Sequence, residues 1–465
     1  MCFVSAQVAR REAWTHFRQN GPMPYPRFFL ARQVFPRPRL VEPGGDLRAT
    51  IAQTVAKELE KCGFGAALKP GQSVAITAGS RGIANIALIL NAAADFVREC
   101  GCEPFLVPAM GSHGGGTSAG QAAVLANLGI TEETVGCPIR SNMTTRVLGE
   151  LSGSDLLSGS DLAGAQQGHL RGMPVHFDEE ALSADHTLVV NRVKPHTHFT
   201  GDVQSGLVKM LVIGLGKHEG AKVAHRAAID YGWQPIAQAG ARLALERGNC
   251  RAGLAILENG FDETARIVGL AADEFLTGEP ELLHQAESLM GGLPFAGADV
   301  LIVDEMGKNI SGAGMDTVVV GRKPGQDLPG VKRIWVRRLT EETHGNATGL
   351  GSADYCSPGL LQQIDHSVTR INCTTGGNPR AGMIPLSYDT EQATADALFS
   401  TLGLCPPEES RCMWIRSTRH LEIVGCSESL FEQAQAREDL QIVSELQEMP
   451  FDADGGLADL IPSSQ

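Results

Sequence analysis

A buried strand, a glycine-rich polar loop and a helix follow one another twice near the start of this 465-residue chain. The first copy leads from the apolar run 73–77 to an apolar helix over 83–97. The second leads from the apolar run 103–110 to a helix that ends at Leu128. This alternation is typical of a parallel α/β sheet, in which ligands bind at the carboxyl ends of the strands. The sequence therefore predicts an α/β fold with its functional side chains in the loops that follow strands.

Basic side chains occur at the carboxyl ends of three predicted strands, the two described above and one further along the chain. Arg81 lies in the first loop, His113 lies in the second, and a further buried strand over 186–193 leads directly into the segment 194–225. That segment holds four of the chain's 13 histidines and four lysines: His196, His198, His218, His225, Lys194, Lys209, Lys217 and Lys222. Imidazoles suit proton transfer and metal ligation, and a lysine in apolar surroundings can become a nucleophile or a covalent anchor. We expect an active site where these strand ends meet.

The chain is too long for one hydrophobic core, and its composition changes along its length. Glycines over 290–297 suggest a passage into a second α/β unit, with strands over 299–303 and 333–339 and helices over 358–369 and 390–402. We therefore expect four parts: a proline-rich N-terminal arm (1–44), a first α/β domain (45–289), a second, smaller α/β domain (290–443), and an acidic tail that frays (444–465).

Charge and cysteine usage limit the class of protein. The formal net charge of −14 argues against a nucleic-acid or anionic-membrane partner, because no basic field is available to neutralise phosphates. Eleven scattered cysteines without a CxxC pair indicate reduced thiols. The N-terminal residues lack the apolar core of a signal peptide, and no apolar run reaches the length of about 18 residues that a membrane span needs. The sequence predicts a cytoplasmic protein.

Two motif interpretations of the histidine segment fit poorly. Residues 214–220, Gly-Leu-Gly-Lys-His-Glu-Gly, approach a dinucleotide fingerprint, but the third glycine comes one position late and the motif lies in mid-domain. A zinc-type metallohydrolase would use the same histidines, but the HExxH pattern is absent. A non-catalytic or cofactor-free metal-binding protein remains an alternative from another class.

Six residues in chain order carry a resemblance to a known family. His225 follows Lys209 by sixteen residues, His113 lies in a Gly-Ser-His loop after a strand, and His196 follows a proline. Arg81 lies in an early strand-end loop, and Lys308 lies in the loop after the strand 299–303. In this order and spacing the chain, over roughly residues 45 to 440, resembles the nickel-dependent lactate racemase family of 2-hydroxyacid racemases and epimerases.

The resemblance implies a fold, a cofactor and residue roles. It implies two α/β domains with mostly parallel sheets and the active site in the cleft between them. Lys209 would carry, covalently bound, a nickel-pincer nucleotide (pyridinium-3-thioamide-5-thiocarboxylic acid mononucleotide) supplied by cofactor-biosynthesis enzymes, and His225 would complete the nickel coordination. His113 and His196 would act as acid and base, and Arg81 and Lys308 would bind the substrate carboxylate.

The implied reaction is inversion of the α-carbon of a small 2-hydroxy acid. The α-hydrogen beside a carboxylate is too weakly acidic for direct removal, so the family transfers a hydride to the cofactor and back while a histidine holds the hydroxyl proton. His196 lies thirteen residues before Lys209, where ten would be expected, so His198 is an alternative second acid/base. The sequence leaves the substrate open between lactate, malate, aromatic 2-hydroxy acids and larger sugar acids.

Overall fold

The computed structural model describes residues 23–80, 82–156, 172–323 and 330–462. The chain divides into two compact units, each described by itself below. The N-terminal unit is Pro36–Gly291, and the C-terminal unit consists of Met1–Phe35 together with Gly292–Gln465. The division therefore falls within the glycine-containing stretch that suggested a passage between domains.

A five-stranded sheet forms the centre of the N-terminal unit, with the strand order β3-β2-β6-β7-β8. Its first four strands are parallel, and β8 runs antiparallel to β7 at the edge. The strands are β2 (Ser73–Ala78), β3 (Glu103–Pro108), β6 (His186–Arg192), β7 (Cys250–Glu258) and β8 (Thr264–Ala271). The parallel part brings the carboxyl ends of β2, β3, β6 and β7 to one edge of the sheet.

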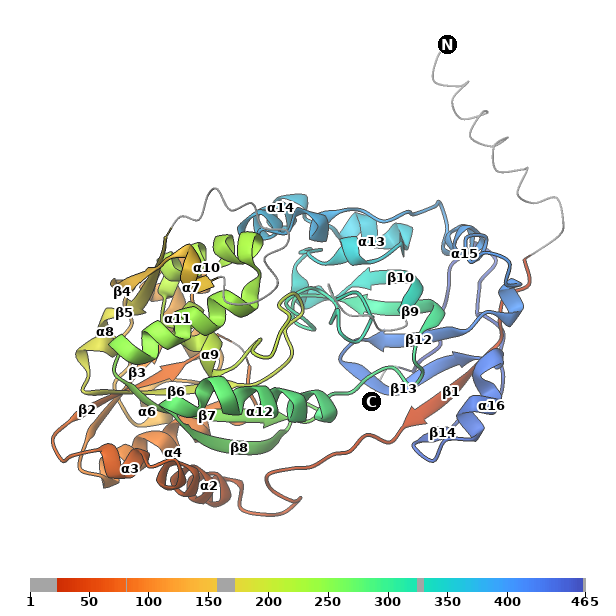
Figure 1. The fold of residues 1–465 in the computed structure, drawn as a ribbon. Helices are drawn as coiled ribbons and strands as arrows, with labels where there is room; N and C mark the ends of the chain where they lie inside the picture. The colour runs from red at the N-terminus through yellow and green to blue at the C-terminus, as the bar shows by residue number, and fades with distance from the viewer. Residues whose placement is uncertain (1–22, 81, 157–171, 324–329, 463–465) are drawn as a thin grey trace, which may run out of the picture. The chain divides into compact units, whose positions relative to one another are not determined.

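Helices cover both faces of this sheet (Figure 1). Alternate strand residues enter opposite cores, as the period of two requires: Ile76 packs with α2 (Leu47–Lys61) and α4 (Ile86–Glu99), and Ala75 packs in the other layer. That second layer contains α9 (Leu207–Lys209), the π-helix η4 (Met210–Gly214), α11 (Trp233–Arg247) and α12 (Phe275–Leu289). The segment that follows Gly206 therefore belongs to the core and is not a polar surface loop.

Smaller elements complete the N-terminal unit. A two-stranded antiparallel sheet pairs β4 (Thr145–Leu151) with β5 (Met173–Asp178). The remaining helices are α3 (Phe64–Ala67), α5 (Ser118–Asn127), α6 (Glu132–Val135), α7 (Gly153–Leu156), α8 (Glu179–Ser183) and α10 (Lys217–Tyr231), with 3-10 turns η2 (Gly114–Gly116) and η5 (Ala272–Glu274).

The C-terminal unit is built on a seven-stranded sheet with the order β11-β10-β9-β12-β13-β1-β14. The part from β11 to β12 is parallel, and the part from β12 to β14 is antiparallel. Its strands are β1 (Phe28–Gln33), β9 (Ala298–Met306), β10 (Val331–Leu339), β11 (Tyr355–Cys356), β12 (Cys412–Ser417), β13 (His420–Ser427) and β14 (Leu440–Ile442). Together with the first sheet, it confirms the predicted α/β class.

Helices of the C-terminal unit differ from the prediction at one place. A single helix was expected over 358–369, but the chain forms α13 (Pro358–Gln363) and then α14 (His366–Thr375). The break occurs because the Asp365 carboxylate accepts hydrogen bonds from Ser367 N and Val368 N and so starts a new helix. The other helical elements are α15 (Glu391–Phe399), α16 (Phe431–Gln435), η6 (Glu341–Thr343), η7 (Leu350–Ser352), η8 (Pro379–Gly382), η9 (Pro407–Glu409) and η10 (Glu428–Leu430).

The proline-rich arm does not remain outside the sheets, contrary to the prediction. Residues 28–33 form β1, an internal strand paired antiparallel with β13 on one side and β14 on the other. The flanking residues Pro26 and Pro36 lie just outside the strand, so no ladder hydrogen bond is lost.

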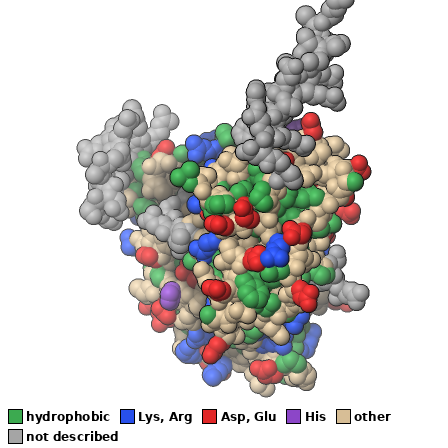
Figure 2. Space-filling view, turned by 90° about the vertical axis from the view of Figure 1, so that its right-hand side faces the viewer, with side chains coloured by type: hydrophobic (Ala, Val, Ile, Leu, Met, Phe, Trp, Pro, Cys, Tyr) green, Lys and Arg blue, Asp and Glu red, His purple; other side chains and the backbone are tan. Residues whose placement is uncertain are grey.

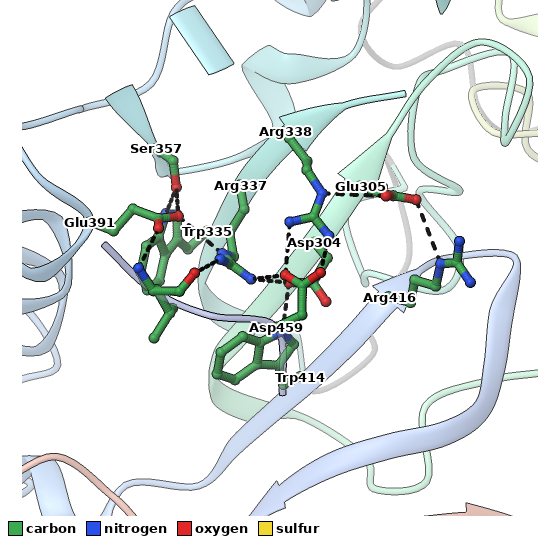
Figure 3. A network of polar contacts seen from close by, with 11 residues as sticks. Asp304, Glu305, Trp335, Arg337, Arg338, Ser357, Glu391, Trp414, Arg416 and Asp459 are labelled. Atoms are coloured by element: carbon green, nitrogen blue, oxygen red, sulfur yellow. Dashed lines mark hydrogen bonds and ion pairs between the residues drawn. The ribbon is translucent and has the colours of Figure 1, made fainter. Parts of the chain in front are cut away.

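The expectation that the acidic tail frays is also wrong for its described part. Met449, Leu457, Leu460 and Ile461 are buried in the core that covers one face of the seven-stranded sheet. Arg337 of β10 fixes the same segment, because its guanidinium contacts Asp459 Oδ1 at 2.8 Å and donates to the Leu457 carbonyl oxygen (Figure 3). Since the Arg337 side chain also pairs with Asp304 at 2.7 Å and Glu391 at 3.0 Å, the tail adds a carboxylate to a network of charges around the buried Arg337 guanidinium.

Candidate functional site

The predicted strand ends do meet at one edge of the five-stranded sheet. A Cβ added to Gly79, directly after β2, would lie 3.6 Å from Oδ1 of Asn191 near the end of β6 and 3.8 Å from the methyl carbon of Met210. The Asn191 side chain in turn donates to the Gly206 carbonyl oxygen at 2.9 Å. The end of β2, the end of β6 and the segment that carries Lys209 are therefore in contact.

Lys209 lies at the junction between α9 and the π-helix η4. Single π-turns are rare in proteins and occur frequently at functional sites, because they change the direction of side chains within a helix. Residues 210–214 of the π-turn are all buried, which anchors the backbone beside Lys209 in the core. His225 lies on α10, the helix that follows η4, so the sixteen-residue spacing runs from the end of α9 through η4 and into α10.

Phe199 connects the Lys209 and His225 side chains. The Lys209 ammonium lies 5.1 Å from the centroid of the Phe199 ring, and the ring centroids of Phe199 and His225 are 5.9 Å apart. Burial by the surrounding protein, together with the positive charges of Lys209 and His113, lowers the pKa of His225 from 6.5 to about 4, although the residue keeps an exposed surface. The Phe199 ring thus lies close to both Lys209 and His225, and His113 is near enough for its charge to act on His225.

The loop from Lys194 to Ser205 holds the other two histidines of the segment. It is closed at its base by Lys194 N–H, which donates to the Ser205 carbonyl oxygen at 2.9 Å. The Gln204 side chain accepts from His196 N at 2.8 Å, and Trp233 Nε1 donates to the Val203 carbonyl oxygen at 2.8 Å. These bonds give the loop a defined shape even though it contains no regular secondary structure.

Aromatic stacking fixes the His196 ring within this loop. Its centroid lies 4.2 Å from that of Phe199, with 16° between the planes, and Phe199 stacks in turn on Trp233 at 4.3 Å and 8°. Trp233 is almost fully buried at the start of α11. The stack therefore ties His196 to the core, whereas His198 is an exposed residue.

His113 is placed by the glycine loop that follows β3. Its Nδ1 lies 2.8 Å from the Met110 carbonyl oxygen. The buried Gln121 side chain donates to the Gly111 carbonyl oxygen at 2.9 Å and so fastens α5 to the loop. Gly116 adopts a φ of +64°, and a Cβ there would lie 2.8 Å from Nδ1 of His218, so His218 packs against the loop.

The sequence did not predict a buried carboxyl group that contacts α9, the helix that carries Lys209. Glu279 of α12 is 1% exposed, and its Oε2 accepts from Val208 N at 2.9 Å, at the start of α9. A Cβ on Gly206 would lie 2.5 Å from the Glu279 carboxyl carbon, so glycine is required for this close approach. Burial raises the pKa of Glu279 to about 7. The signal for this residue was its place in the apolar stripe of a helix.

The sequence also did not predict a buried ion pair, which Lys217 forms with Asp178. Lys217 begins α10 in the left-handed region, with a φ of 51°, and its ammonium lies 2.7 Å from Asp178 at the end of β5. It also donates to the carbonyl oxygen of Pro108, the last residue of β3. Lys217 therefore joins the start of the His113 loop to the helix that carries His225.

Neither of the two predicted substrate residues belongs to the described part of the N-terminal unit. Arg81 lies outside the described residues. Lys308 belongs to the C-terminal unit, where its ammonium donates to the Gly312 carbonyl oxygen at 2.6 Å and its backbone N–H donates to Thr343 Oγ1 at 3.0 Å. The roles of both residues remain predictions.

The residues present fit the group that the sequence resemblance implied. An amine and an imidazole face the same phenylalanine, and the low pKa of His225 keeps a nitrogen lone pair available for a metal. Among the described residues, no three His, Cys, Asp or Glu side chains form a group that could hold a metal ion.

No helix in the described parts of the chain is long and apolar enough to cross a membrane. On the face shown in Figure 2, basic, acidic and hydrophobic side chains are interspersed, and the described residues form no extended basic area there.

The fold is similar to that of a solved structure, the lactate racemase apoprotein from Thermoanaerobacterium thermosaccharolyticum. The TM-score is 0.51 at 11% sequence identity, and the match covers 84% of this chain and 94% of the other. No family model and no curated protein sequence matches the chain. At this level of identity the similarity concerns the α/β fold.

Proposed function

We propose that this protein is a racemase or epimerase that inverts the α-carbon of a 2-hydroxy acid with the help of a nickel-pincer nucleotide bound to Lys209. The observation that carries the proposal is the meeting of Lys209, His225 and His113 at the carboxyl edge of the five-stranded sheet. The fold similarity to a lactate racemase apoprotein supports the same reaction class.

Lys209 and His225 would hold the cofactor. The lysine amine would form the covalent attachment, and the neutral imidazole of His225 would ligate nickel, which accepts nitrogen ligands of this kind. When bound, the nucleotide would supply a hydride acceptor that the protein's own side chains lack. The buried π-turn after Lys209 gives the attachment point a fixed backbone.

Proton transfer to and from the substrate hydroxyl would fall to histidines on two separate loops. His113 donates its Nδ1 proton to the Met110 carbonyl oxygen, so its Nε2 carries the lone pair that can accept a proton. A second histidine, His196 or His198, would act from the loop 194–205. Two positions are needed because the two enantiomers direct their hydroxyl groups differently.

Arg81 and Lys308 are the proposed partners of the substrate carboxylate. A guanidinium binds a carboxylate through two parallel hydrogen bonds, and an ammonium adds a second positive charge. The substrate is a small 2-hydroxy acid or a larger sugar acid with the same α-carbon. A chiral-product assay over lactate, malate, aromatic 2-hydroxy acids and aldonic acids would separate these cases.

Peptide mass spectrometry tests the proposal directly. The protein is produced in a host that makes the cofactor, and the peptide containing Lys209 is searched for a nucleotide adduct. We expect the adduct in the natural sequence and in Lys222→Ala, a control on the exposed side of α10, but not in Lys209→Ala. An unmodified Lys209 peptide would contradict the proposal, and nickel bound without an adduct would favour a cofactor-free metal-binding protein.

A further inference from the structure

His113 and His196 are held by opposite kinds of backbone group. The Nδ1 atom of His113 faces a carbonyl oxygen, that of Met110, at 2.8 Å. The Nδ1 atom of His196 instead receives two backbone N–H groups, from His198 at 3.1 Å and from Phe199 at 3.0 Å. A carbonyl oxygen can only accept a hydrogen bond, and a backbone N–H can only donate one.

These partners fix the position of the ring proton on each histidine. His113 must carry its proton on Nδ1 in order to donate to Met110, which leaves the lone pair on Nε2. His196 must keep its lone pair on Nδ1, so the neutral ring carries its proton on Nε2. A proton added to Nδ1 of His196 would face two N–H donors and would cost both hydrogen bonds.

We propose that His196 acts as a fixed Nε2–H hydrogen-bond donor that orients the substrate, and that His198 is the second acid/base. This inference rests on the proposed racemase function for its substrate. His196 cannot accept the hydroxyl proton on Nε2, because that atom already carries a proton. It cannot donate its Nε2 proton either without forming an imidazolate, which is far too basic to exist at neutral pH.

His198 has the contacts that an acid/base requires. Its Nδ1 lies 3.0 Å from Thr197 Oγ1, and a hydroxyl group can rotate to donate or to accept. Both protonation states of the ring are therefore compatible with this contact. In the proposed step, the proton leaves the hydroxyl oxygen of one enantiomer and binds a ring nitrogen of His198, and the resulting imidazolium returns it to the oxygen when that same enantiomer forms again; His113 serves the hydroxyl group of the opposite enantiomer in the same way.

The surroundings of His196 match a donor with a fixed direction. Gln204 Oε1 accepts from the His196 backbone N–H at 2.8 Å, and the ring stacks on Phe199, which stacks on buried Trp233. A ring that is clamped at Nδ1 and on one face cannot rotate to exchange its two nitrogens. His198 lies beside it, with 6.2 Å between the ring centroids.

Nitrogen-15 NMR of the histidine rings in the unloaded full-length protein tests the tautomers without any need for activity. The two ring nitrogens differ in chemical shift according to which one carries the proton, and His113→Gln, His196→Gln and His198→Gln variants assign the signals. We expect an Nδ1–H pattern for His113 and an Nε2–H pattern for His196 near pH 7. An Nδ1–H pattern or an imidazolium pattern for His196 would overturn the inference.

Glutamine variants of the cofactor-loaded protein test the roles. A glutamine amide can replace an Nε2–H donor but cannot transfer a proton, so His196→Gln should retain racemisation within about tenfold, while His196→Leu should not. His198→Gln should lose about 10²-fold or more, and His284→Gln, an exposed control on α12, should be unchanged. Loss in His196→Gln with retention in His198→Gln would refute the assignment. If no variant or parent protein racemises any substrate, the proposed function fails, while the NMR result still decides the tautomers.

Discussion

Replacement of Glu279 by glutamine should make the N-terminal unit less sensitive to pH. Removal of the carboxyl group from solvent raises its pKa from 4.5 to about 7, and the N–H groups of Val208 and Leu207, which favour the carboxylate, oppose this only in part. In the unfolded chain the carboxyl group ionises near its ordinary value. Between these two pH values the folded protein therefore binds one more proton than the unfolded chain.

The sign and size of the effect follow from this difference. Stability falls with rising pH wherever the folded state binds more protons, by about 1.4 kcal/mol for each unit of pKa shift. For Glu279 the loss between about pH 4.5 and about pH 7 is on the order of 3 kcal/mol, and it remains constant at higher pH. Glutamine is neutral throughout, so Glu279→Gln should gain about 3 kcal/mol relative to the parent protein between about pH 5 and about pH 8.

Urea unfolding followed by thiol labelling measures the free energy of unfolding of the N-terminal unit, which contains Glu279. Cys250 lies in β7 and is 3% exposed, so a short pulse of maleimide labels it when the N-terminal unit unfolds. Cys426 lies fully buried in β13 and reports on the C-terminal unit as an internal control. The pH comparison cancels any constant cost of the glutamine amide, because that cost is the same at both pH values.

The reasoning would be refuted by parallel pH profiles. If Glu279→Gln and the parent protein lose the same stability at Cys250 between the two pH values, the Glu279 carboxyl group ionises normally inside the fold. Glu287→Gln, on the exposed side of the same helix, is the matched control and should follow the parent profile. A change confined to Cys426 would also contradict the prediction, because Glu279 belongs to the other unit.

Three further variants test the supports of the site and of the tail. Lys217→Met leaves Asp178 buried without its counter-charge and should cost about 3–5 kcal/mol at Cys250, while an unchanged urea midpoint would contradict a buried ion pair. Gly206→Ala forces a Cβ against the Glu279 carboxyl group and should cost about 1–3 kcal/mol in the same assay. Arg337→Leu should cost about 3–5 kcal/mol at Cys426 and speed proteolysis within residues 444–462; an unchanged cleavage rate would show that the network does not hold the tail.

The sequence predicted the centre of the fold better than its margins, for a physical reason. The parallel strands of the five-stranded sheet are buried on both faces, so they are continuous apolar runs with glycine loops behind them. The strand β1 was missed because the density of prolines around it suggested an extended arm. The tail was misjudged because its buried side chains are sparse and meet their partners only across large sequence separations.

For the candidate site, spacing and loop position placed basic side chains at the predicted strand ends. They did not reveal the buried Glu279 carboxyl group, which contacts the backbone of α9. Glu279 was nevertheless within reach of sequence reasoning. Phe275, Leu282, Leu283 and Ala286 are the buried apolar positions of α12, and Glu279 lies four residues after the first and four before the third. A carboxyl group in the apolar stripe of a helix must be neutralised or hydrogen-bonded, so its position alone predicted an unusual environment.

The proposed tautomer of His196 is a different case, because the groups that contact its Nδ1 atom belong to the backbone. Its Nδ1 partners are the backbone N–H groups of residues 198 and 199, which almost any residue type would supply in the same loop conformation. What decides the matter is that the chain turns back over the ring, and this turn depends on the closed base of the loop and on the stack against Trp233. Sequence reasoning could therefore place two histidines in the loop and leave their roles open, whereas the backbone hydrogen bonds to His196 support the proposal that it is a donor and that His198 is the base.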